Sequence, residues 1–274
     1  MGVSVSNFGN VRKGSITTPI IADGLVLNID AFNVNCLLPY RQDDDYSSIG
    51  SIYSSVDNGR GQRLTTGSIK DNSTIGGWQG PTTSSFYFGS NDLIELNKST
   101  ADLIPSNSSF TIGAFMKFQF GSYFADILGF SDHPPEANEL NVYADVDNQD
   151  LSISFNNTTH VGVYFDFDWS GPGVNDLNKW FYLTWVYQVG SAPTPSKLTG
   201  YLNGLKSVAN NTNSTTTNSY TSPTTNAQIG HTGVNQQNKW VSNVQIYNRA
   251  LTQTEVQHNF NALKGRFPIN YTPG

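Results

Sequence analysis

Asp166 and Asp168 are the residues of this sequence that come closest to a catalytic pair. They lie two residues apart in the segment 160–169, where apolar side chains alternate with polar ones. Because alternate residues of a strand point to the same face, the two carboxylates would lie close together. Such a pair could serve retaining glycoside hydrolysis or bind Ca²⁺. Solvated aspartates on a strand explain the pattern more simply, and we favour that interpretation.

The other residues that hydrolysis or metal chemistry would need are scarce. The glutamates are few and form no Glu-x-Asp-x-Glu arrangement on a strand; they are Glu95, Glu136, Glu139 and Glu255. The histidines have no metal-binding spacing and are His133, His160, His231 and His258. No Gly-x-Ser-x-Gly nucleophile motif is present. We therefore expect no enzyme and no cofactor, with Ca²⁺ at the aspartate pair as the one ion left open.

Sugar binding requires fewer specific residues than hydrolysis or metal binding. It needs an aromatic ring and a few hydrogen-bonding groups in a shallow groove. Four aromatic residues lie next to turns rich in Gly, Asn and Asp, and we take them as candidate glycan platforms: Trp78, Trp169, Tyr220 and Trp240. Aromatic residues at the edge of a core show the same pattern, so this alternative stays open for each.

The composition excludes several classes of function. Of the 274 residues 13% are charged, the net charge is −6, and no basic cluster is longer than Arg12-Lys13, which argues against nucleic acid as a partner. No apolar run approaches the roughly 18 residues of a membrane span. The start, Met1–Asn7, lacks the basic and apolar regions of a signal peptide, so we expect synthesis in a cytoplasm. The single cysteine, Cys36, lies in an apolar context that favours a buried, inert thiol.

The clearest local structure lies near the end of the sequence. Alternation over 240–247 predicts a half-buried strand. Thr252 and Glu255 form a Thr-x-x-Glu capping box that predicts the start of a helix, and Gly265 predicts its end. Leu251 is expected to pack on the first turn of this helix. The helix carries an apolar stripe that suits packing against one sheet, made of Val256, Phe260 and Leu263.

The pattern in the rest of the chain predicts short strands separated by turns. The segment 20–30 predicts a first strand, with Leu25, Leu27 and Ile29 on one face, that pairs near the strand at 240–247. We therefore expect an all-β, two-sheet antiparallel sandwich with one short C-terminal helix. The expected organisation is an N-terminal arm, the sandwich domain and a tail, at residues 1–19, 20–267 and 268–274. The arm is too polar to form a core and is expected to fasten the domain to a partner by strand addition.

Several segments resemble one known family. Ala227–Gly230, Val244–Thr252 and Glu255–Val256 resemble the closing signature of laminin-G-like members of the concanavalin A-like lectin and glucanase superfamily. Earlier segments agree in order, at 24–30, 88–96, 110–117, 180–187 and 200–204. Many members carry Trp where this chain has Phe115, a change that keeps an apolar position filled. The ending Asn259–Phe267 resembles the copies of this domain in virion proteins of tailed bacteriophages.

The resemblance implies a concanavalin A-like jelly roll and a function. We expect a non-enzymatic structural protein of a phage virion, on the surface of the capsid or tail, with decoration, stabilisation or adhesion as its role. Its implied partners are other virion proteins, contacted through the arm, in an assembly with multiple copies of the chain. The alternatives are a carbohydrate-binding module for host surface glycans and a glycoside hydrolase of the same superfamily.

Overall fold

A computed structural model describes the parts of the chain that form the sandwich. The described residues are 19–31, 51–53, 66–70, 77–78, 85–88, 93–118, 124–129, 140–145, 150–155, 159–164, 179–191, 194–206, 214–215, 220–230 and 239–267. Residues 1–18 of the predicted arm (1–19), the tail (268–274) and Cys36 lie outside them.

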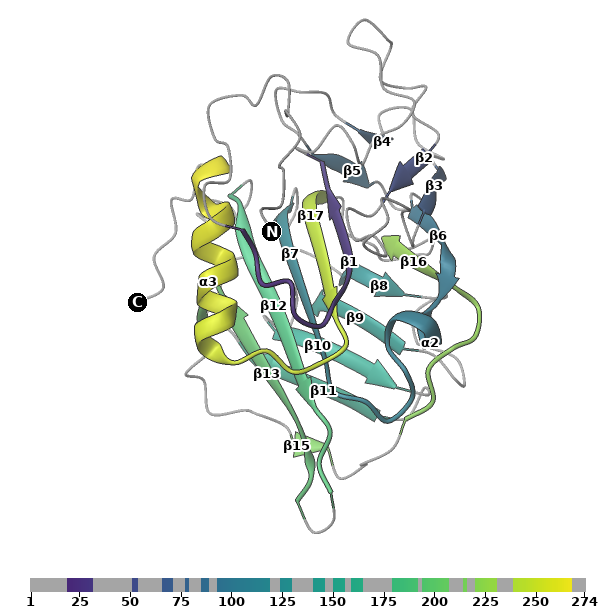
Figure 1. Ribbon diagram of the computed structural model, residues 1–274, viewed down its shortest axis with the longest axis vertical. Helices are drawn as coiled ribbons and strands as arrows, with labels where there is room; N and C mark the ends of the chain where they lie inside the picture. Colours follow the sequence, from purple (N-terminus) through teal and green to yellow (C-terminus); the bar gives the residue numbers. More distant parts are fainter. Residues whose placement is uncertain are drawn as a thin grey trace, which may run out of the picture.

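Two antiparallel sheets form the fold, as predicted (Figure 1). Sheet A has the order β14-β13-β12-β7-β17-β5-β4, with β1 paired to β17 and β15 to β13. Its strands are β1 (Leu25–Asp30), β4 (Gly77–Trp78), β5 (Phe86–Phe88), β7 (Phe110–Phe118), β12 (Phe181–Gln188), β13 (Ser196–Leu202), β14 (Leu205–Lys206), β15 (Ser214–Thr215) and β17 (Lys239–Tyr247).

Sheet B has the order β11-β10-β9-β8-β16-β6-β3-β2. Its strands are β2 (Ser51–Tyr53), β3 (Thr66–Lys70), β6 (Leu93–Ser99), β8 (Phe124–Gly129), β9 (Leu140–Asp145), β10 (Asp150–Phe155), β11 (Thr159–Tyr164) and β16 (Asn226–Gly230). A short helix that was not predicted from the sequence, α2 (Thr100–Leu103), follows β6 and begins with a capping box between Ser99 and Asp102.

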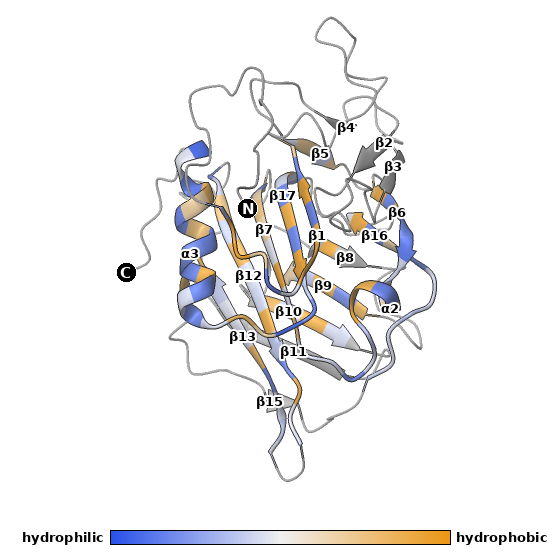
Figure 2. Ribbon diagram, in the orientation of Figure 1, coloured by the Kyte–Doolittle hydropathy of each residue, from blue (hydrophilic) through white to orange (hydrophobic). Residues whose placement is uncertain are grey.

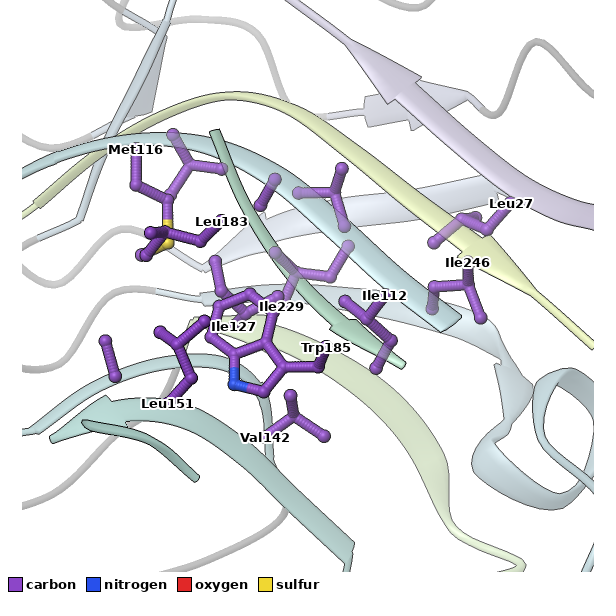
Figure 3. Close-up of a cluster of buried hydrophobic side chains, with 14 of the residues drawn as sticks. Leu27, Ile112, Met116, Ile127, Val142, Leu151, Leu183, Trp185, Ile229 and Ile246 are labelled. Atoms are coloured by element: carbon purple, nitrogen blue, oxygen red, sulfur yellow. The ribbon is translucent and has the colours of Figure 1, made fainter. Parts of the chain in front are cut away.

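The main core lies between the two sheets (Figure 3). Trp185 of β12 is fully buried there, and its indole Nε1 donates a hydrogen bond to the Tyr143 carbonyl of β9 at 3.2 Å. This bond joins sheet A to sheet B through the middle of the core. Side chains around it come from both sheets and include Leu27, Ile112, Met116, Ile127, Val142, Leu151, Leu183, Ile229 and Ile246.

Strand β17 is buried on both faces, so the prediction of a half-buried strand is wrong. Val244 and Ile246 face the main core, while Tyr247 belongs to a second cluster under the C-terminal helix. The polar Asn243 and Gln245 are also buried, because neighbours cover the outer face of the sheet and supply hydrogen bonds: Asn243 Nδ2 donates to the side chain of Asn28, and Gln245 accepts from Tyr182.

Strand β1 pairs with β17, as predicted, but its side chains do not share one face as expected. The register shifts between Leu25 and Leu27, which is the mark of a β-bulge. Leu27 and Ile29 therefore enter the main core, whereas Leu25 packs on the opposite side with the cluster under the helix. An extra residue in a strand reverses the alternation beyond it, and the sequence pattern does not reveal such an insertion.

Helix α3 (Gln253–Leu263) starts as the capping box predicted. Thr252 Oγ1 accepts from the Glu255 amide at 3.3 Å, and Glu255 Oε2 accepts from the Thr252 amide at 2.8 Å. The apolar stripe is buried against sheet A, and Leu251 packs with Val256. In Figure 2 the helix carries both apolar and polar residues. Gly265 is not its stop: it lies inside a 3-10 turn, η3 (Lys264–Arg266), without a left-handed backbone conformation.

Candidate functional site

Four side chains form a row across the outer face of sheet A. Trp240 of β17 is paired with Tyr87 of β5 on one side and with Lys117 of β7 on the other. Trp180 precedes β12 and follows Lys117 in the same row, since Phe181 pairs with Met116. We call Tyr87, Trp240, Lys117 and Trp180 the aromatic row. It lies on the face of sheet A that α3 also covers, because the next residue along each strand points into the main core.

The members of the aromatic row contact one another directly. The Trp240 and Tyr87 rings meet edge to face with 5.0 Å between centroids. Lys117 Nζ lies 4.0 Å from the centroid of the Trp240 ring and 5.7 Å from that of Trp180, within the range of cation–π attraction. Tyr87 and Trp180 are buried, whereas Trp240 and Lys117 are half-buried. The surface of the site is therefore formed by an indole and an ammonium group.

Lys117 carries a charge that burial disfavours. Burial lowers the pKa of its ammonium group. Among the described side chains, the ion pairs join Arg249 to Asp23 and Glu255, and Arg266 to Asp30. No described carboxylate therefore pairs with Lys117, and its ammonium group lies against two indole rings.

The layer beneath α3 holds the aromatic row in place. Phe267 stacks on Phe115 with 4.1 Å between centroids and also contacts Trp180 at 4.9 Å. Tyr182 lies over Gly113, where an added Cβ would come within 2.5 Å of the phenol oxygen, so this close approach requires glycine. Packing of this kind fixes side-chain rotamers, which is what a preformed binding site needs.

Tyr220, one of the predicted glycan platforms, is a core residue. It is 3% exposed, and its ring meets Phe110 and Tyr187 edge to face. Its hydroxyl lies 3.0 Å from the Pro105 carbonyl and 2.8 Å from that of Ser108. Burial raises the pKa of this phenol to about 12. No ring face is open to a sugar, so a platform role does not fit its position.

Of the other predicted site residues, the structure brings Trp240 alone into a described site. The strand that holds Trp78 is described, but its side chain is not, and Trp169, Asp166 and Asp168 lie outside the described residues. Tyr87, Lys117 and Trp180 were missed. One signal was available, because Lys117 is the single charge in the apolar strand 110–118. Their meeting depends on strand register, which no local pattern specifies.

Several of the described acidic side chains have structural contacts. Asp102 caps α2, and hydrogen bonds from Ser99 lower its pKa. Asp30 accepts two hydrogen bonds from Arg266. Within the described part of the chain, no group of three or more His, Cys, Asp or Glu residues could hold a metal ion. No described helix is long and apolar enough to cross a membrane.

Glu255 gives an expected pH dependence. Hydrogen bonds from Arg249, at 2.6 and 3.0 Å, lower its pKa from the ordinary 4.5 to about 2. The ionised form is favoured by folding, so its contribution is complete above about pH 4.5 and is lost as the pH falls toward 2. Thermal melting from pH 7 to 2 should show a smaller loss of stability over this window for Glu255→Gln than for the wild type. Equal losses of stability between pH 7 and 2 in the two proteins would contradict a lowered pKa for Glu255.

A profile described as "Concanavalin A-like lectin/glucanases superfamily", of the laminin G type, matches residues 88–257. The chain belongs to this superfamily. Among curated proteins, none gives a significant match to the chain.

Solved structures of similar fold include three toxin domains. The binding domain of botulinum neurotoxin serotype D has 11% identity and a TM-score of 0.56, over 87% of this chain and 51% of that one. The binding domain of Paraclostridial Mosquitocidal Protein 1 has 16% identity and a TM-score of 0.54, over 87% and 52%. Botulinum neurotoxin type C, whose cell entry depends on two ganglioside molecules, has 14% identity and a TM-score of 0.56, over 88% and 51%.

At these identities the likeness concerns the fold alone. The chain spans about half the length of the toxin chains it matches.

Proposed function

We propose that the chain is a non-catalytic subunit of a phage virion that adheres to surface glycans. The aromatic row carries this proposal. It joins a half-buried indole to a half-buried ammonium group on a rigid sheet, and these groups can bind a ligand but include no acid or base pair for hydrolysis.

The positions of three described acidic groups favour binding over catalysis. Hydrolysis by paired carboxylates requires two carboxyl groups facing a sugar across a gap of about 5 to 10 Å. Glu255 and Asp30 are instead held by arginines, and Asp102 by a helix cap. Each of these three groups is committed to stability.

A virion role is favoured by the ending of the chain and by the site where the arm begins. The ending Asn259–Phe267, which resembles phage virion proteins, supplies buried residues of α3 and Phe267. Asn259 Oδ1 accepts from the Ile21 amide at 2.9 Å, and Tyr247 donates to the Ile21 carbonyl at 3.1 Å. Ile20 also packs under the helix. Ile20 and Ile21 are therefore anchored beside α3, at the point where the proposed fastening arm would begin.

Removal of residues 1–18 tests this function. We expect the truncated chain to melt like the full-length chain, because Ile20 and Ile21 keep their contacts, but not to enter the particle. Particles lacking the chain should adsorb less to host cells. The measurements are circular dichroism, immunogold labelling of particles and an adsorption assay.

Two outcomes would contradict the proposal. Normal incorporation of the truncated chain would show that the arm is not the fastener. Release of reducing ends from a polysaccharide by the full-length chain would show that the protein is a hydrolase. Ile21→Ala in the full-length chain is the matched control: it should lower the melting temperature and leave incorporation intact.

A further inference from the structure

Basic residues gather at the end of sheet A that holds the aromatic row. Lys117 belongs to the row, Lys179 precedes Trp180, and Lys239 precedes Trp240. Lys264 and Arg266 lie in η3, directly before Phe267, which contacts Trp180. Lys239 is fully buried on the core side of the sheet, with its Nζ 6.0 Å from the centroid of the Phe88 ring, and adds no charge to the outer face. Lys117 and Lys264 place positive charge on the outer face, in a chain whose net charge is −6.

The basic residues at this end of sheet A differ in whether a carboxylate neutralises them. Arg266 forms a buried ion pair with Asp30 at 2.7 Å. Lys264 is exposed, and its Nζ lies 5.4 Å from the centroid of the Phe260 ring. Lys117 is held against the two indoles, with no described carboxylate to pair with it. A partly desolvated ammonium gains more from an added anion than a fully hydrated one, because the local dielectric constant is lower.

We propose that this end of sheet A is a binding site for an acidic glycan. A carboxylate or sulfate of the sugar would pair with Lys117, and the sugar ring would lie against the exposed part of Trp240. The inference rests on the proposed adhesive function and specifies its ligand class. Lys264 adds long-range attraction for a polyanion, which raises the rate of association at low salt.

The position of Lys117 suits this role. An ammonium group has three donors, and contact with a ring face leaves donors for an anion. The Trp240 and Trp180 rings restrain the lysine side chain before the ligand arrives, which reduces the entropy lost on binding. A purely structural lysine would have the same ring contacts, but its removal would not change binding to anions.

The test measures binding of the full-length chain to three polysaccharides: polygalacturonate, heparin and dextran. They carry carboxylates, sulfates and no charge, respectively. We expect the chain to bind at least one acidic polymer, more weakly as salt rises, and dextran poorly. Lys117→Gln should weaken this binding about tenfold, as the loss of one partly buried charge pair implies. Lys117→Arg should retain most of it.

Lys197→Gln is the matched control, because Lys197 is exposed on β13 near the opposite end of the same sheet and the charge change is identical. It should leave binding unchanged, and melting curves of all variants verify folding. Acidic binding that is unaffected by Lys117→Gln, or equal binding to dextran, would overturn this site while leaving adhesion in place. Binding to none of the polymers would overturn the adhesive function itself.

Discussion

Replacing Phe260 by alanine is expected to lower the free energy of unfolding by about 3 to 5 kcal/mol, the usual cost of truncating an enclosed aromatic side chain. The ring is 9% exposed and stacks near Phe115 and Tyr182, with centroid separations of 6.4 and 6.2 Å. It also contacts the β13–β14 turn, where a Cβ on Gly204 would meet it at 3.2 Å. Truncation would leave a cavity that the sheet cannot fill.

The matched variant is Thr252→Ala, which removes the cap of the same helix. Its side chain is exposed, and loss of such a cap costs about 1 kcal/mol. Chemical denaturation of both variants measures the difference. Equal costs, or no cost for Phe260→Ala together with loss of particle binding, would show that α3 faces a partner and not sheet A.

Replacing Asp30 by asparagine is expected to cause a second large loss of stability, because Asp30 forms a buried ion pair with Arg266. Arg266 Nη1 lies 2.9 and 2.7 Å from the carboxylate oxygens of Asp30, and both side chains are at most 7% exposed. Asp30→Asn keeps the shape but leaves a buried guanidinium without its counter-charge. Breaking a buried pair in this way costs about 3 to 5 kcal/mol.

The double variant Asp30→Asn, Arg266→Met distinguishes two contributions to the free energy of unfolding. One is the destabilisation caused by leaving Arg266 without Asp30, and the other is the net stabilisation by the ion pair. We expect it to be more stable than Asp30→Asn alone, because no unpaired charge remains buried. Denaturation midpoints of the single and double variants give the coupling energy. Strictly additive costs would show that the two side chains do not stabilise each other.

The features predicted correctly from the sequence are those fixed by nearby residues. Thr252 and Glu255 satisfy each other's backbone amides across three positions, so the start of α3 follows from the local sequence. The alternating strands follow from the requirement for one buried face, which fixes the fold class. The family resemblance, carried by the closing strand and helix, led to the same fold.

The features that were missed depend on contacts between distant residues. The buried polar face of β17 depends on Asn28 and Tyr182, which reach it from other strands, and the reversal at Leu25 depends on a bulge. The aromatic row joins four segments whose register is set by strand pairing. Tyr220 and Trp240 are both aromatic residues near turns, yet one is enclosed by Phe110 and Tyr187 and the other reaches the surface.

The position of β17 has a consequence for the order of folding. This strand lies inside sheet A, with β7 on one side and β1 and β5 on the other, but it is synthesised after all of them. Until it emerges from the ribosome, those strands have open edges, which are prone to pairing with other chains. Sheet A must therefore be completed after translation of β17, and helper proteins or assembly partners that protect open edges would improve the yield of folded protein.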